Sequence, residues 1–542
     1  MSKITDYLNE RLDGEVASGE EARRQFATDG SVLAIAPSLV VYPRGVDDVR
    51  KMARFTWRLA ERGQVLPLTA RGNGTDPTGA ALSRGTILSM PAHMAQVMEF
   101  DLKQRLIRIQ AGISLETLRQ ATATQGLWLP IDGGSTRAMT AGGAIANDAL
   151  GRRFAKYGTM RDWVDKLEVV LANGEVIETG RISRRELDDK KGLQTLEGEI
   201  YRAVDQLIDE NAEAISHISS GDVLRGGGYA LDLVKAENGS FDLTPLFVGS
   251  QGTLGVITQA IIHLNDLPRE EGIIVFALNG DEDMAKLTNE LLELKPEALE
   301  FIDGETLTLI REYTGMQPWK SVTSDLPYAL VFVEFDDKHM MRQLRKAGKI
   351  MEAAGITNAK IAYTPGDVDD VMKIYDSVAV VTNRSEHGVA AVPLATNLSV
   401  QSGNIFEVVD AIRKMTKRLH IDVGVWGNIA AGSITIRPIV NLANLSQRRS
   451  LILMIEGLAE LVRQADGSLA GVGGGGRLLS PWLMREYDKQ TVNLFANVRH
   501  IFDPYGILNT GVKDGQTTPA DTEILLRQTY HNELSTRYYL RG

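Results

Sequence analysis

The sequence predicts an α+β protein with two domains, and three observations support this class. The chain has 542 residues, of which 43% are hydrophobic, and this is more than one ordinary core can use. Its first half mixes helical patterns with many short strand patterns. From about residue 270 onward, strands and helices follow one another in an order that is typical of an antiparallel sheet covered by helices on one face.

The first half is expected to hold short strands between a few helices. The pair Asn173-Gly174 stands between two alternating apolar runs and predicts a hairpin. The expected strands are residues 40–43, 64–69, 87–90, 96–100, 106–111, 167–171, 176–179, 246–248 and 256–264. The expected helices are residues 5–12 and 19–27, a helix that Asp47 or Asp48 could cap and that runs through Glu61, and residues 115–125 and 193–211.

The second half alternates longer apolar strands with amphipathic helices. The expected strands are residues 272–278, 328–335, 390–392, 423–426 and 433–438. The expected helices are residues 281–294, 339–354, 406–419 and 446–465, followed by a tail helix around residues 522–527.

Charge and composition exclude several classes of function. The formal net charge is −11 and no block is rich in Lys or Arg, so nucleic acid is a poor partner. The chain has no cysteine, which excludes disulfides, iron–sulfur clusters and thiolate zinc sites. We find neither a signal-peptide pattern nor an apolar stretch of about 18 residues, so we expect a cytoplasmic protein without a transmembrane segment. Peripheral contact with a membrane and assembly into a homo-oligomer stay open.

A glycine-rich segment, residues 67–79, directly follows a predicted strand. It lacks the G-x-G-x-x-G pattern of a Rossmann turn and the Gly-Lys-Ser/Thr of a P-loop. Closely spaced glycines still offer a nest of backbone N–H donors that suits a pyrophosphate, although the segment alone fits an ordinary glycine-rich turn equally well. The candidate ligands here are Arg71, Gly72, Asn73, Gly74, Thr75 and Gly79.

Three further segments carry related patterns. Residues 132–159 contain Gly134, Ser135, Thr140, Gly142, Gly143, Asn147 and Gly158. Residues 249–258 contain Gly252, Thr253, Gly255 and Ile257. Residues 502–513 contain Asn509 and Lys513.

In this order and at these separations, the four segments resemble the FAD-linked oxidases of the vanillyl-alcohol oxidase / p-cresol methylhydroxylase (PCMH) superfamily. The strongest resemblance is to the branch of D-lactate dehydrogenases and glycolate oxidase flavin subunits. It implies a PCMH-type FAD-binding domain of two subdomains and an α+β cap domain with an antiparallel sheet. The implied boundaries are an N-terminal helical segment at 1–35, the FAD domain at 36–268, the cap at 269–500, and a segment at 501–542 that returns to the FAD domain.

The resemblance also assigns roles to the glycine-rich segments. The first loop would wrap the FAD pyrophosphate, and Gly142, Gly143, Asn147 and Gly158 would line the dinucleotide and its ring. Gly252, Thr253 and Ile257 would lie on the adenosine side, while Asn509 and Lys513 would return to the flavin. Gln251 stands where Glu is usual. None of the eight histidines lies in the loops that carry a covalent flavin link in relatives, so we expect FAD to be bound non-covalently.

The metal motif of that branch is altered. The family pattern G-H-A-G-x-G-x-x-H-x-R-P matches residues 426–438, but Asn428 and Thr435 occupy the two His positions. The later E-H-G matches Val472 and Gly473 at its Glu and His positions. Amide, hydroxyl and aliphatic side chains are not zinc-type ligands, so we expect no catalytic metal.

Candidate catalytic residues remain in the expected cap. His387 could act as a general base, although a solvent-exposed loop histidine is the more common situation. Arg384, Arg437 and Arg477 could hold an anionic substrate, and Arg437 could equally form a structural ion pair. Asn428 completes this set.

We therefore expect an FAD-dependent oxidoreductase that accepts hydride from a small hydroxylated substrate, anionic substrates included, and passes electrons to an external acceptor. Two alternatives stay open. One is a flavin-binding pseudoenzyme or partner subunit with little turnover. The other is a D-lactate-type dehydrogenase with a rearranged site.

Overall fold

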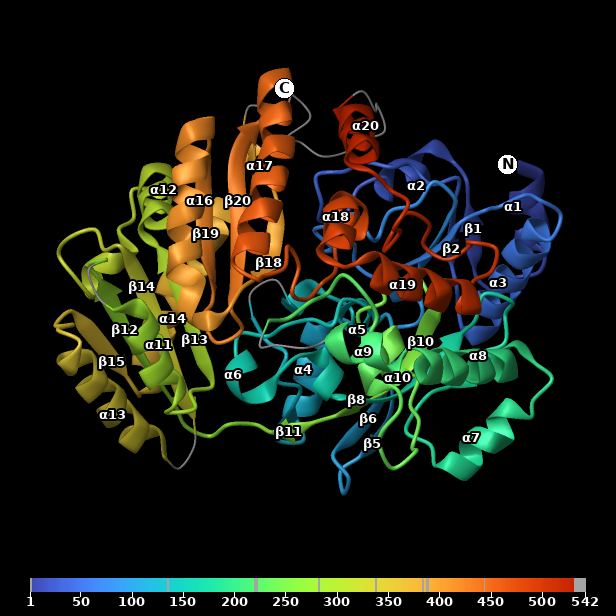
Figure 1. Cartoon of the computed structure of the whole chain (residues 1–542), viewed down its shortest axis with the longest axis horizontal. Helices are drawn as coiled ribbons and strands as arrows, with labels where there is room; N and C mark the ends of the chain where they lie inside the picture. Colours follow the sequence, from blue (N-terminus) through green and yellow to red (C-terminus); the bar gives the residue numbers. More distant parts are fainter. Residues whose placement is uncertain are drawn as a thin grey trace.

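The chain folds into two halves joined side by side. A computed structural model describes residues 2–133, 136–218, 223–280, 283–336, 339–382, 385–386, 389–442 and 444–530. The blue-to-green half of Figure 1 carries a four-stranded, a five-stranded and a two-stranded sheet, and the yellow-to-orange half carries one large sheet. The red C-terminal helices lie over the blue-to-green half, so the chain crosses to the second half and comes back.

The first sheet brings together strands of both directions. Its order is β1-β2-β4-β3, with β1 antiparallel to β2 and the other two pairings parallel. The strands are β1 (Glu15–Ala17), β2 (Leu39–Tyr42), β3 (Leu68–Arg71) and β4 (Thr86–Ser89). The helices of this part are α1 (Ser2–Asn9), α2 (Glu20–Gln25) and α3 (Val46–Ala60).

The second sheet is antiparallel, and β10 lies at its centre. Its order is β5-β6-β10-β8-β9, and the predicted hairpin at Asn173-Gly174 joins β8 to β9. The strands of this region are β5 (Val97–Asp101), β6 (Leu106–Gln110), β7 (Leu127–Trp128), β8 (Val164–Val170), β9 (Val176–Glu178), β10 (Val256–His263) and β11 (Asn265–Asp266). The helices are α4 (Leu115–Ala123), α5 (Ala141–Ala146), α6 (Phe154–Tyr157), α7 (Arg184–Lys191), α8 (Leu196–Glu210), α9 (Ala212–Ile218) and α10 (Thr244–Phe247).

The second half, called the cap below, is built on a large antiparallel sheet. Over the described residues its main order is β15-β12-β14-β13-β19-β20-β17-β16, with β18 also paired to β20. The strands are β12 (Glu271–Leu278), β13 (Ala298–Asp303), β14 (Ala329–Asp336), β15 (Ala359–Ala362), β16 (Ser385–Glu386), β17 (Val389–Ala391), β18 (Ala395–Ser399), β19 (Asp422–Asn428) and β20 (Ser433–Asn441).

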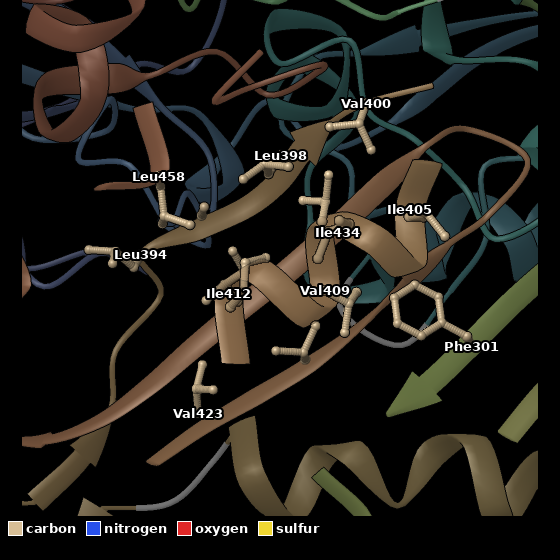
Figure 2. Close-up of a cluster of buried hydrophobic side chains, with 14 of the residues drawn as sticks. Phe301, Leu394, Leu398, Val400, Ile405, Val409, Ile412, Val423, Ile434 and Leu458 are labelled. Carbon is tan, nitrogen blue, oxygen red and sulfur yellow. The ribbon is translucent and has the colours of Figure 1, made fainter. Parts of the chain in front are cut away.

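Helices pack on both faces of this sheet, not on one face as predicted. Alternate residues of β14 show this, because Val331 belongs to one core cluster and Leu330 to another. Figure 2 shows part of the larger cluster, where Ile405, Val409 and Ile412 of α16 meet the sheet. The cap helices are α11 (Met284–Leu292), α12 (Gly304–Thr314), α13 (Met340–Ala353), α14 (Pro365–Asp376), α15 (Val378–Thr382), α16 (Ile405–Leu419) and α17 (Leu445–Gln464).

The chain then returns to the first half through α18 (Gly476–Leu483), α19 (Lys489–Phe502) and α20 (Pro519–Tyr530). The segment after α19 adds to the open edge of β3. The N–H of Leu68 donates to the carbonyl of Ile507, and the N–H of Asn509 donates to the carbonyl of Leu68. Among the described residues, no helix has both the length and the apolar character needed to cross a membrane.

Two sequence predictions of local structure were wrong. Residues 246–248 were expected to form a strand but lie largely in helix α10, where Pro245 occupies the first turn. Neither Asp47 nor Asp48 caps α3, because Gly45 is the residue before its first turn. Asp48 is instead buried and accepts hydrogen bonds from the N–H groups of Asp13, Gly14 and Arg44.

Candidate functional site

A cleft in the first half is built from three of the glycine-rich segments. It holds about 770 Å³ of space that protein atoms do not fill, part of it open to solvent. Its walls are Ala70, Arg71, Gly72, Asn73, Gly74, Thr75, Asp76, Ala80, Ala81, Met90, Ala111, Met139, Thr140, Gly142, Gly143, Ala146, Asn147, Gln251, Gly252, Gly255 and Ile257.

Glycine is required at several of these positions by geometry. A Cβ at Gly72 would collide with the Thr140 hydroxyl, and one at Gly142 would lie 2.8 Å from the Ala111 Cβ. Gly74 and Gly252 have φ of +69° and +73°, a conformation that other residues adopt at a cost. The first glycine-rich segment therefore packs closely against Thr140 of the second, and the second packs closely against Ala111.

Asp76 fixes the shape of the first loop. Its Oδ1 accepts the N–H groups of Thr78 and Ala80 at 2.8 and 3.0 Å, and its Oδ2 accepts the Asn147 amide at 3.1 Å. The loop is thus tied to the second glycine-rich segment by a charge-assisted hydrogen bond.

Arg71 lines the cleft but directs its guanidinium toward the N-terminal segment. It donates to the carbonyls of Phe26 and Thr28 at 3.2 and 2.7 Å. Arg71 therefore holds the first loop against the N-terminal segment.

Most of the predicted cofactor ligands line this cleft, but some described ones do not. Gly79, Gly158, Thr253, Asn509 and Lys513 are absent from its walls. Gly158 makes a turn with φ of +67°, and the Thr253 hydroxyl bonds Tyr229 at 2.7 Å. Gly134 and Ser135 lie outside the described residues, as do Arg384 and His387.

Asn509 and Lys513 support the cleft from behind. The Asn509 amide donates to the carbonyls of Ala80 and Gln251 at 2.9 and 2.6 Å, so it joins the first and third cleft segments. The Lys513 ammonium donates to the carbonyls of Gly226 and Gly228 at 2.6 and 2.8 Å. Burial lowers the pKa of Lys513 to about 7.

Arg477 connects the cap to the same scaffold. It donates to the Gly79 carbonyl at 2.7 Å, to the Asn509 Oδ1 at 2.9 Å and to the Thr510 carbonyl at 2.8 Å. Burial lowers the pKa of Arg477 to about 10, which leaves it a cation at neutral pH. Its donors are used within the protein, so it is a structural cation of the returning chain.

The residues at the altered metal positions do not fit a metal ion. Asn428 uses both ends of its amide, because Nδ2 donates to the Arg152 carbonyl at 2.7 Å and Oδ1 accepts the Ala431 N–H at 2.9 Å. The Thr435 hydroxyl donates to the Thr396 carbonyl at 2.7 Å. Within the described part of the chain, no group of three or more His, Cys, Asp or Glu side chains is placed to hold a metal. Arg437 lies half-buried on β20 opposite Gly424.

A buried ionic cluster joins the cap sheet to the segment that follows Asn147. Arg152 and Arg153 both contact Glu334, and Arg153 also pairs with Glu271 at 2.5 Å. Lys156 pairs with Glu297 at 3.0 Å and with Asp336. These contacts form the polar part of the interface between the two halves.

Two carboxyl groups near Arg152, those of Glu334 and Glu300, have pKa values shifted in opposite directions. Burial favours the neutral form of Glu334, but Arg152 and Arg153 outweigh it and hold its pKa below the usual value. Burial raises the pKa of Glu300 to about 8, against the attraction of Arg152 and a hydrogen bond with Tyr375. Glu334 pairs across the sheet with Ala298, two residues before Glu300, so both carboxyl groups lie on the same face.

Sequence reasoning did not select two polar residues of the cleft, Asp76 and Gln251. Asp76 could have been found, because an Asp two residues before Thr78 in a glycine-rich loop favours a side-chain-to-backbone turn. Gln251 was noticed only as a departure from the family pattern. Its role depends on segments that are distant in sequence, and no local signal reveals it.

Comparisons with known proteins match both halves of the chain. The family described as "FAD binding domain" matches residues 37–180, and the family "FAD linked oxidases, C-terminal domain" matches residues 267–512. A D-2-hydroxyglutarate dehydrogenase of Pseudomonas putida is 25% identical over 517 residues, covering 93% of this chain. The chain spans about half, 51%, of that relative's own length.

A glycolate oxidase subunit of Bacillus subtilis is 24% identical over 480 residues, covering 88% of each chain. The solved structure of a 4-ethylphenol oxidase from Gulosibacter chungangensis has a TM-score of 0.68 at 16% identity, covering 94% of this chain and 96% of that one. The likeness to that structure confirms the expected PCMH-type fold. The chain therefore carries an FAD binding domain followed by the C-terminal domain of FAD linked oxidases.

Proposed function

We propose that this chain is an FAD-dependent oxidoreductase that oxidises the hydroxyl-bearing carbon of a small 2-hydroxy acid or a related hydroxylated compound. The observation that carries the proposal is the cleft, because three glycine-rich segments that are far apart in the sequence line one space in and beside the matched FAD binding domain. The names of the relatives, a D-2-hydroxyglutarate dehydrogenase and a glycolate oxidase subunit, support the substrate class.

FAD would lie along the cleft with its pyrophosphate on the loop Gly72–Thr75. Gly252, Gly255 and Ile257 would accompany the adenosine side, and Gly142, Gly143 and Asn147 the ring side. No described wall residue is a His, Cys or Tyr, which supports a cofactor held without a covalent bond. Bound FAD would supply the acceptor for the substrate's hydride.

Arg437 is our candidate for an anionic group of the substrate, and Arg384 and His387, outside the described residues, stay candidates for binding and for proton removal. Because the side chains of Asn428 and Thr435 form hydrogen bonds within the protein, we propose that the reaction needs no metal of the family type. The sequence-based domain boundaries, a cytoplasmic location and an external electron acceptor are part of the same proposal.

The test is anaerobic reduction of the purified yellow protein. D-2-hydroxyglutarate, D-lactate, glycolate, polyols and sugar acids are added separately, and loss of the flavin absorbance is followed. Bleaching by one class of compound supports the oxidoreductase. Loss of that bleaching after a chelator would contradict metal independence and favour a rearranged D-lactate-type site.

Two other outcomes would reject parts of the proposal. A yellow protein that no donor bleaches favours a flavin-binding pseudoenzyme or partner subunit with little turnover. A colourless protein that takes up no FAD would overturn the assignment of the cleft.

A further inference from the structure

One side chain of the cleft, Gln251, lies where several distant segments meet. It is nearly fully buried, and its φ of +53° is unusual for a residue other than glycine. Its own N–H donates to the Ala146 carbonyl at 2.8 Å, and its carbonyl accepts the Asn509 amide at 2.6 Å. The backbone of Gln251 is thus held by the second glycine-rich segment and by the returning C-terminal segment.

The side-chain amide of Gln251 reaches across to the cap. Its Nε2 donates to the Gly473 carbonyl at 2.7 Å and to the Asn147 Oδ1 at 3.2 Å, with a longer contact of 3.4 Å to the Thr78 hydroxyl. Its Oε1 accepts the Gly476 N–H at 3.1 Å. The donating end and the accepting end of one amide are therefore both used on residues 473–476.

The cap loop at residues 473–476 is shaped around this amide. Gly473, Gly474 and Gly476 have φ of +80°, +59° and +49°. A Cβ at Gly474 would lie 2.5 Å from the Gln251 Oε1, and one at Gly476 would collide with Thr78. The Gly473 N–H also donates to the Asn147 carbonyl at 2.7 Å. At Gly474 and Gly476 the loop leaves no room for a side chain, because Gln251 and Thr78 lie directly against it.

We propose that Gln251 is a positioning residue that locks the cap loop 473–476 onto the cofactor cleft, so that retention of FAD and order of this loop depend on each other. This rests on the proposed FAD site. The chemistry requires an amide, because a carboxylate could accept from Gly476 but could not donate to Gly473 or Asn147. A protonated carboxylic acid could accept from Gly476 with one oxygen and donate its single O–H to Gly473 or to Asn147.

Gln251→Glu therefore turns the lock into a pH-dependent one. Buried among oxygen acceptors, the new carboxyl is expected to have a raised pKa. The charged groups nearest to it are Asp76, which touches its partners Thr78 and Asn147, and Arg477, which follows Gly476. Asp76 opposes ionisation of the new carboxyl and Arg477 favours it, and neither supplies the missing donor for Gly473.

The experiment measures the rate of FAD release from the purified holoprotein at about pH 5 and about pH 9, together with hydrogen exchange of the peptide that covers residues 473–476. For Gln251→Glu we expect release close to wild type at the lower pH and at least about tenfold faster at the higher pH, with faster exchange of the loop. Gln251→Met has nearly the same volume and no hydrogen-bonding end. It should release FAD about tenfold faster at both pH values.

Gln259→Glu is the matched control, because it adds the same charge on β10, where Gln259 contacts Arg108. The proposal is overturned if Gln251→Glu releases FAD at the same rate as Gln259→Glu at both pH values. It is also overturned if hydrogen exchange at residues 473–476 is no faster in Gln251→Met than in wild type. Neither readout requires a substrate. A wild-type protein without flavin would contradict the proposed function. Hydrogen exchange at residues 473–476, compared between that protein and its Gln251 variants, would still test whether Gln251 holds the loop.

Discussion

The buried carboxyl pair Glu300 and Glu334 gives a prediction with matched variants. Both side chains lie on one face of neighbouring strands, and both residues are nearly fully buried, with 4% and 2% exposure. Glu334 is the charged partner of Arg152 and Arg153, whereas burial raises the pKa of Glu300 to about 8. The same substitution to Gln therefore removes a charge at one site and replaces a mostly neutral acid at the other.

The expected magnitudes differ several-fold. Removing one partner of a buried ion pair costs about 3–5 kcal/mol, so Glu334→Gln should destabilise the cap interface by roughly this amount. Glu300 loses its proton only around pH 8, one unit above neutrality, and one pKa unit corresponds to about 1.4 kcal/mol. Glu300→Gln should therefore cost about 1 kcal/mol or less at pH 7, since Gln resembles the protonated acid and keeps a polar end for Tyr375.

The assay is urea unfolding at pH 7, followed by a probe of the cap such as the fluorescence of Trp426 or Trp319. The shift of the transition that this probe reports is compared between the two variants and wild type. Equal losses for Glu334→Gln and Glu300→Gln would refute the assignment of opposite charge states. A larger loss for Glu300→Gln would refute it as well.

Further predictions concern pH dependence and the glycine wall. Because the pKa of Glu300 is raised from 4.5 to about 8, the folded chain holds the extra proton between these values, so stability falls as pH rises through this window; Glu300→Gln should flatten that part of a plot of unfolding midpoint against pH. The pKa of Lys513 is lowered from 10.5 to about 7, so the unfolded chain binds more protons above neutrality and stability rises with pH between these values. Lys513→Met should abolish this rise in melting temperature. An unchanged rise would show that Lys513 does not cause it. Gly72→Ala should lower the ratio of flavin to protein after purification, because its Cβ collides with the Thr140 hydroxyl. Gly348→Ala, with open space around it inside α13, should keep the flavin and stabilise the helix by about 0.5–1 kcal/mol. Equal flavin content in both variants would contradict the close approach at Gly72.

Elements with a regular apolar pattern could be predicted from the sequence. The hairpin at Asn173-Gly174 formed as expected, because its turn type is encoded locally. Strand β13 was missed, although it lies near the middle of the cap sheet. Its sequence Ala298–Asp303 contains Glu300 and Asp303, which interrupt the apolar run. Both are buried, and their partners, Tyr375 and Arg413, come from distant parts of the chain, so local periodicity could not reveal them.

The candidate site shows the same division. The glycine-rich segments predicted the cleft, because positions where two backbone segments pack closely favour glycine. The roles of single polar side chains could not be read in the same way. Asn509 and Lys513 stand in one of the recognised segments, yet both donate to backbone carbonyls of the scaffold. Which atoms meet a side chain is decided by tertiary packing.

The pairing of β3 with residues 507–509 has a consequence for synthesis of the protein. The strand that leads into the first cleft loop is made early, but its partner at Ile507 and the Asn509 amide that joins two cleft segments emerge hundreds of residues later. A nascent chain that still lacks these residues carries an open strand edge at β3. The ribosome therefore finishes most of the cap before the cofactor cleft can close, and a chain that stops short of Asp503 should collect in aggregates and carry no flavin.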